Sequence, residues 1–98
     1  YTGSGIVIAV VDTGVDNEHF SLDDFTDNNH DNTKDPDELP DPKWVAGCDA
    51  TGIGQSGCNE EDPDDGDGHG THVGGIALGT GDWTRINQGY APGSYLVD

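Results

Sequence analysis

Apolar residues gather in a few short stretches of this chain, and long polar segments separate them. The first stretch, residues 5–12, begins with a glycine, continues as an unbroken run of isoleucine, valine and alanine, and ends on Asp12. A run without polar alternation is typical of a parallel strand covered on both faces, so we predict such a strand here. A turn follows it, in which Gly14 provides backbone angles closed to other residues.

Two later stretches predict further strands. Residues 43–50 are apolar enough for a short second strand, and residues 89–97 end in a third one. Between the first strand and the second, residues 16–22 are expected to form either one short helical turn or an irregular loop. Ninety-eight residues are enough for one small domain, and no internal repeat is apparent.

A helix is predicted between the second and third strands. Val73, Ile76 and Ala77 recur at helical spacing, which predicts a helix from about residue 69 to residue 78. Asp67 is a suitable cap for its first turn, and the glycines that follow residue 78 end it. Strands and a helix in this order predict an α/β layered fold, with a parallel sheet and flanking helices.

Two acidic segments, at about residues 23–42 and 51–66, separate the predicted elements. Their prolines, glycines and carboxylates leave little to bury, so they are expected to be exposed loop insertions. Over the whole chain, 20 Asp and Glu face only 3 Lys and Arg, which gives a net charge of -17. This balance argues against nucleic acid as a partner, because phosphate recognition needs Lys and Arg.

The large negative charge opposes compaction unless salt or bound cations relieve it. Three explanations remain open: the protein works in concentrated salt, its acidic loops bind calcium, or part of the chain is disordered. Residues 59–67 are the strongest local candidate for calcium, because carboxylates there alternate with other residues and a glycine allows a turn. The carboxylates expected to be its ligands are Asp62, Asp64, Asp65 and Asp67.

The two cysteines, Cys48 and Cys58, are close enough in sequence to close a short loop. In a secreted protein this spacing favours a disulfide over a metal pair, because no Cys-x-x-Cys pattern is present. Two free thiols are the alternative. No apolar run approaches the length of a membrane span.

Asp12 and His69 are the residues of greatest chemical interest. Asp12 ends the first strand, at the edge where ligand crevices form in open α/β sheets. His69 begins the predicted helix and titrates near neutral pH, so it can take a proton from a hydroxyl and return it to a leaving amine. A carboxylate beside that imidazole would fix its tautomer and stabilise the imidazolium.

Taken singly, each of these residues has a simpler interpretation. Asp12 could cap the turn that follows it, and His69 could be a surface histidine in a loop. His72 lies three residues after His69, a spacing that suggests zinc. However, no glutamate follows His69, as it does in the His-Glu-x-x-His pattern of metalloproteases.

Four stretches, in order, resemble the subtilisin family of serine proteases. They are residues 10–16, similar to the family's aspartate motif; residues 43–47, which have a counterpart between the motifs; residues 69–75, similar to its histidine motif; and residues 89–97, similar to its next strand. The ordered set is far more specific than any one motif, and it spans most of the chain outside the acidic loops.

The resemblance implies roles for particular residues. Asp12 would be the orienting carboxylate and His69 the general base and acid, whereas His72 would be a packed structural residue of the helix. The implied reaction is hydrolysis of peptide bonds through an acyl-enzyme, with a polypeptide substrate and no organic cofactor. The implied architecture is part of a subtilisin-like layered fold.

The family's nucleophilic serine is not recognisable among these residues. The four serines of the chain all lie outside a nucleophile-like context; they are Ser4, Ser21, Ser56 and Ser94. The chain contains no methionine and stops just after an apolar stretch. We therefore expect residues 1–98 to be part of a peptidase catalytic domain, inactive alone, whose main partner is the remainder of its own domain.

The sequence as a whole predicts part of a secreted, acidic serine endopeptidase that works outside the cell, in a salt-rich environment or with calcium. Two other functions remain open. One is a non-catalytic cation-binding module on the same scaffold. The other is an inactive homologue in which the downstream serine is replaced.

Overall fold

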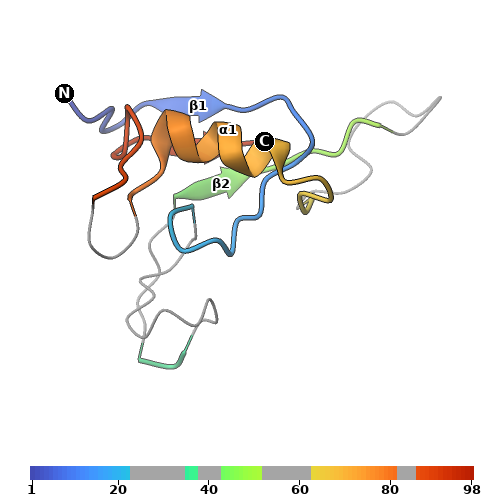
Figure 1. Ribbon diagram of the computed structural model, residues 1–98, viewed down its shortest axis with the longest axis horizontal. Coiled ribbons are helices and arrows are strands. Elements are labelled where there is room, and N and C mark those ends of the chain that lie inside the picture. Colours follow the sequence, from blue (N-terminus) through green and yellow to red (C-terminus); the bar gives the residue numbers. More distant parts are fainter. Residues whose placement is uncertain (23–34, 38–42, 52–62, 82–85) are drawn as a thin grey trace.

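The structure of the protein is a computed structural model that describes residues 1–22, 35–37, 43–51, 63–81 and 86–98. In chain order its elements are β1 (Val7–Ala9), β2 (Trp44–Ala46), α1 (His69–Leu78) and β3 (Tyr95–Val97). Figure 1 shows α1 lying across the small sheet. This arrangement agrees with the expected α/β fold.

The sheet is parallel, and β3 lies between β1 and β2. In the β1–β3 pair, Ile8 lies opposite Leu96 and Ala9 opposite Val97. The connection from β2 to β3 passes through α1. Because all three strands point the same way, their carboxyl ends meet at one edge of the sheet, and residues that follow β1 come close to the start of α1.

The core lies between α1 and one face of the sheet. Leu78 and Leu96 have no exposed surface, and Val15 and Leu22 are each 1% exposed. Ile8, Trp44, Val73 and Ala77 pack against this cluster. Burial of these apolar side chains is the main force that holds the helix on the sheet.

The first strand differs from its prediction. It spans Val7–Ala9 rather than residues 5–12, since β3 offers only three residues for it to pair with. The prediction of burial on both faces is wrong for this chain: Val7 is 55% exposed, and its cross-strand neighbour Tyr95 is 40% exposed. The one described helix covers the opposite face, so these apolar side chains have no cover among the described residues.

The later elements follow their predictions more closely. The helix has the predicted bounds, whereas the second and third strands are shorter than residues 43–50 and 89–97. At the C-terminal end of α1, the carbonyl oxygens of Ile76 and Ala77 accept hydrogen bonds from the N–H groups of Tyr90 and Ala91. No helix in the described part of the chain is long and apolar enough to cross a membrane.

The cap of α1 is not the predicted one. Gly68 occupies the N-cap position with φ of 92°, and its residue type provides no side-chain cap. The prediction that Asp67 caps the helix is therefore wrong. Asp65 instead accepts a hydrogen bond from the N–H of Thr71 in the first turn, at 2.8 Å.

The connecting segments are only partly described. Residues 16–22 form turns, with hydrogen bonds from His19 N–H to the Asp16 carbonyl and from Leu22 N–H to the His19 carbonyl. Most of the predicted loop insertions, 23–42 and 51–66, lie outside the described residues. Cys48 is disulfide-bonded, whereas its predicted partner Cys58 lies outside the described residues.

Candidate active site

Asp12 lies just beyond β1, at the carboxyl edge of the sheet. The N–H of Val10 still bonds to the Val97 carbonyl, and the chain then leaves the sheet. The Asp12 side chain is 18% exposed. Its Oδ1 atom accepts a hydrogen bond of 2.8 Å from the N–H of Thr13, which fixes the orientation of the carboxylate.

His69 meets Asp12 across 57 positions of sequence. The imidazole Nδ1 of His69 lies 2.7 Å from Oδ1 of Asp12, a hydrogen-bond distance. The His69 side chain is 62% exposed, so a reacting group can approach it. The structure thus brings together the two residues that the sequence singled out for catalysis.

The two side chains shift each other's pKa in opposite directions. The hydrogen bond to Asp12, followed by the negative charge of Asp12, raises the pKa of His69. The hydrogen bond from His69, followed by that from the Thr13 N–H, lowers the pKa of Asp12. An ionised Asp12 accepts a hydrogen bond from the Nδ1–H group, which leaves the unprotonated Nε2 of the neutral imidazole free to take a proton from a nucleophile.

Glycines at two positions let α1 and the segment before it approach the turn after Asp12 closely. A Cβ atom on Gly70 would overlap the carbonyl oxygen of Gly14. Gly14 has φ of 103°, and a Cβ there would come within 2.7 Å of the Asp64 carbonyl oxygen. The backbone at Gly14 therefore packs directly against the backbone at Gly70 and Asp64, next to the contact between Asp12 and His69.

Asp65 links the two motifs, a role that the sequence did not reveal. Its carboxylate accepts hydrogen bonds from the hydroxyl of Thr13, at 2.8 Å, and from the hydroxyl of Thr71, at 2.6 Å. Desolvation raises the pKa of Asp65, but the hydrogen bonds from Thr71, Gly68 and Thr13 outweigh it and hold that pKa well below its ordinary value. The one sequence feature that could have indicated this role is the position of Asp65, four residues before the helix.

The predicted calcium ligands do not form a cluster in the described part of the chain. No group of three or more His, Cys, Asp and Glu side chains converges there, and Asp62 lies outside it. Asp64 and Asp67 are exposed, and both oxygens of Asp65 accept hydrogen bonds from the protein. Calcium binding by these residues stays a prediction.

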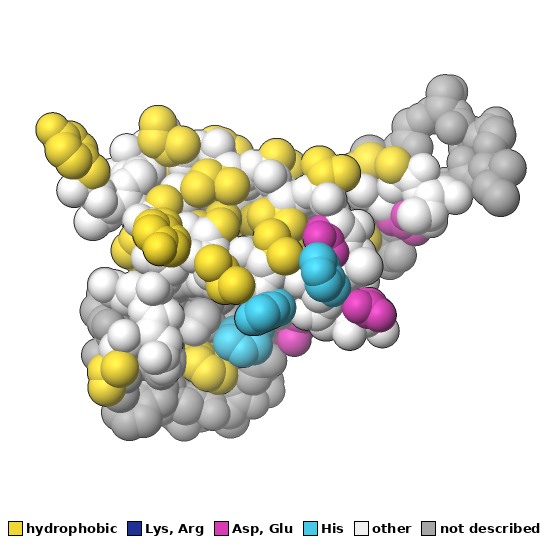
Figure 2. Space-filling model, turned by 45° about the horizontal axis from the view of Figure 1, so that its top comes forward, with side chains coloured by type: hydrophobic (Ala, Val, Ile, Leu, Met, Phe, Trp, Pro, Cys, Tyr) yellow, Lys and Arg dark blue, Asp and Glu magenta, His cyan; other side chains and the backbone are white. Residues whose placement is uncertain are grey.

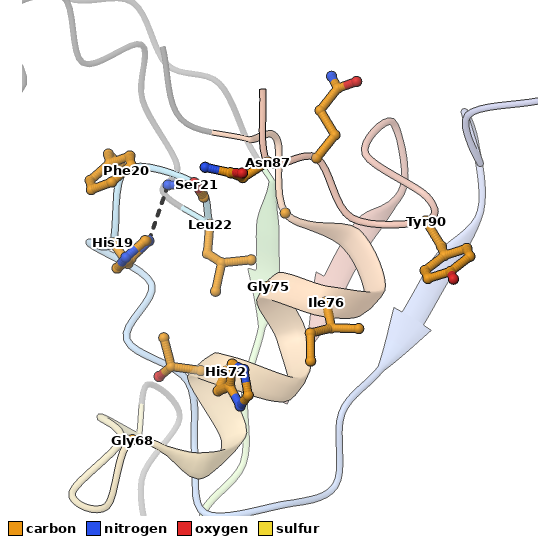
Figure 3. A pocket seen from close by; sticks show the side chains of 13 residues that line it. His19, Phe20, Ser21, Leu22, Gly68, His72, Gly75, Ile76, Asn87 and Tyr90 are labelled. Atoms are coloured by element: carbon orange, nitrogen blue, oxygen red, sulfur yellow. Dashed lines mark hydrogen bonds between the residues drawn. The ribbon is translucent and has the colours of Figure 1, made fainter. Parts of the chain in front are cut away.

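A groove of about 670 Å³ runs beside α1. His72 and Ile76 on the helix, with Phe20 and Tyr90, are among its lining residues (Figure 3). Figure 2 shows histidine side chains gathered on one face, next to acidic side chains and hydrophobic surface. His72 is exposed here, so the prediction of a packed structural histidine is wrong for this chain.

Comparison with known protein families gives one result that bears on this site. The family model described as the Subtilase family matches residues 3–97. The match includes both Asp12 and His69, together with all three strands and α1.

Proposed function

This chain belongs to the subtilase family, and we propose that it provides the base and the orienting carboxylate of a serine endopeptidase. The observation that carries this proposal is the 2.7 Å contact between Nδ1 of His69 and Oδ1 of Asp12. Membership of the family supports a serine-protease-type function and a polypeptide substrate in the full-length protein. The 98 residues alone would be inactive, because none of their serines has the context of a nucleophile.

In the proposed reaction, Nε2 of His69 takes the proton of a serine hydroxyl supplied by another part of the full-length protein. The serine oxygen attacks the scissile carbonyl, and His69 returns the proton to the leaving amine as the acyl-enzyme forms. His69 then takes a proton from water for hydrolysis of that ester and passes it to the serine. Asp12 stays ionised throughout and stabilises the imidazolium.

We also propose that the protein works outside the cell, in a salt-rich environment or with bound calcium. The disulfide at Cys48 supports an oxidising, extracellular location. The net charge of -17 supports either a salt-rich environment or bound calcium, because both relieve self-repulsion. A purely cation-binding module would have no need of a hydrogen-bonded Asp12–His69 pair, so we prefer the peptidase.

The proposal is tested in the full-length protein with His69→Ala and Asp12→Asn, using release of a chromophore from a peptide. In subtilisin itself, loss of the histidine lowers kcat by about 2 × 10⁶ and loss of the aspartate by about 3 × 10⁴, so losses of that order are expected. Asp37→Asn is a matched control, because Asp37 is exposed and distant in sequence from the site. Activity like that of the unmodified protein in either site variant would refute the proposal.

A further inference from the structure

We propose that Asp65 is the positioning residue that holds His69 against Asp12, so that it sets the rate of the reaction without touching the substrate. This inference rests on the proposed function. It is carried by the hydrogen bonds around the Asp65 carboxylate, which join the segment that follows β1 to the first turn of α1.

Among the described residues, five donors reach this one carboxylate. Oδ2 accepts the N–H of Thr71 at 2.8 Å and its hydroxyl at 2.6 Å. Oδ1 accepts the hydroxyl of Thr13 at 2.8 Å and the N–H groups of Gly68 and Asp67 at 2.8 and 3.1 Å. The carboxylate is therefore bonded to residues on both sides of His69 and to the residue that follows Asp12.

Thr13, Thr71 and Asp65 form a hydrogen-bonded cluster, called the clasp below, that joins the segment after β1 to the start of α1. The hydroxyl of Thr13 accepts the N–H of Gly70 at 3.0 Å, and the hydroxyl of Thr71 accepts the N–H of Asp16 at 2.9 Å. Each hydroxyl thus accepts from the other segment and donates its proton to Asp65. Both oxygens at position 65 must then be acceptors, which an ionised carboxylate provides and an amide does not.

The clasp acts on the reacting pair through short covalent links. Thr13 follows Asp12, and its N–H also donates to Asp12 Oδ1. Gly68 and Gly70, which donate to Asp65 and to Thr13, flank His69. A change at Asp65 would consequently loosen both sides of the 2.7 Å contact at once. Asp65 is partly buried, whereas His69 is exposed.

The main test compares Asp65→Asn with Asp37→Asn in the full-length protein. Asn is nearly the size of Asp, but its amide nitrogen cannot accept the proton of a threonine hydroxyl. We expect kcat to fall by about a hundredfold, the loss typical of a small misplacement of a reacting group, with little change in KM. Asp37→Asn removes the same charge at an exposed position and should leave kcat unchanged. Unchanged kcat in Asp65→Asn would overturn the positioning role.

A second pair of variants decides the matter if Asp65→Asn does not fold. Thr71→Ser keeps the hydroxyl of the clasp, whereas Thr71→Val removes it at nearly constant volume. The clasp predicts kcat close to that of the unmodified protein for the serine variant and a large loss for the valine variant. Equal activity of the two variants would contradict it.

A double variant separates positioning of His69 from general damage. In a His69→Ala background, Asp65→Asn should lower the residual kcat no further, because the group that it positions is already gone. The same loss in both backgrounds would overturn the inference.

If His69→Ala and Asp12→Asn abolish activity while Asp65→Asn does not affect it, the positioning role fails and the proposed function stands. If His69→Ala is fully active, the proposed function fails.

Discussion

Oδ1 of Asp12 serves two donors, the imidazole Nδ1 of His69 and the N–H of Thr13. The backbone donor holds the carboxylate in place whether or not the imidazole carries its second proton. In the proposed reaction, such a fixed acceptor needs little reorganisation when positive charge develops on His69, and this kind of preorganisation stabilises charge in enzymes. At the scale of residues, the backbone thus holds the Asp12 carboxylate independently of the imidazole.

The shifted pKa of His69 predicts the pH dependence of peptide hydrolysis. Only the neutral imidazole can act as a base, and Asp12 raises the pKa of His69 above its ordinary value of 6.5. In the full-length protein, kcat/KM should therefore fall as pH falls through this raised pKa. In Asp12→Asn, the inflection of the residual activity should move down towards 6.5. An inflection that stays in the same place, measured by a pH–rate profile, would contradict this cause of the shift.

At the scale of elements, local sequence patterns predict the bounds of the helix better than they predict contacts between residues far apart in the sequence. The spacing of Val73, Ile76 and Ala77 was enough to place α1 at His69–Leu78. The sequence predicts Asp67 as the cap, because it is an aspartate close to the start of the helix. Gly68 is instead the N-cap residue, and Asp65 accepts the N–H of Thr71 in the first turn while it also accepts the hydroxyl of Thr13, 52 positions away in sequence. No local pattern contains that contact.

The close approach of α1 to the Asp12 turn makes a prediction about two glycines of the helix. Gly70→Ala would place a methyl group on the Gly14 carbonyl oxygen, whereas Gly75→Ala meets nothing nearby. In this chain, Gly70→Ala should lower the free energy of unfolding by about 1–3 kcal/mol, as overpacking does. Gly75→Ala should raise it by up to about 1 kcal/mol through better helix propensity.

Thermal unfolding followed by circular dichroism measures the difference between the two glycine variants. The same variants in the full-length protein should differ in kcat as well, because only Gly70→Ala separates His69 from Asp12. Equal stability of the Gly70→Ala and Gly75→Ala variants would contradict the close packing of Gly70 against the Gly14 carbonyl oxygen.

At the scale of the whole molecule, the negative net charge and the uncovered face of the sheet are the features that most affect stability. The charge of -17 follows directly from composition, and the unbroken apolar run that ends on Asp12 predicts the parallel sheet that is observed. The open face of the sheet could not be foreseen, because an Ile- and Val-rich run indicates that a strand is normally covered but not which segment covers it. With Val7 and Tyr95 exposed, we expect the 98 residues to be only weakly stable alone.

Salt should stabilise this chain markedly. Raising the ionic strength shortens the screening length from about 10 Å at 0.1 M to about 3 Å at 1 M, which weakens repulsion among the carboxylates. The melting temperature should therefore rise with added NaCl. A further rise in CaCl₂ at equal ionic strength would support the predicted calcium site, whereas equal effects of the two salts would count against it. No response to either salt would contradict the role given to charge.

The most direct test of the whole account is the protonation of the His69 imidazole. We would record nitrogen-15 NMR spectra of histidine side chains in the full-length protein across a pH series, with His69→Ala to assign the signal. A neutral imidazole protonated on Nδ1, with a pKa above 6.5 that falls in Asp12→Asn, is the predicted result. A His69 that titrates near 6.5 and does not respond to Asp12→Asn would contradict the central claim, that Asp12 and His69 act as one hydrogen-bonded pair.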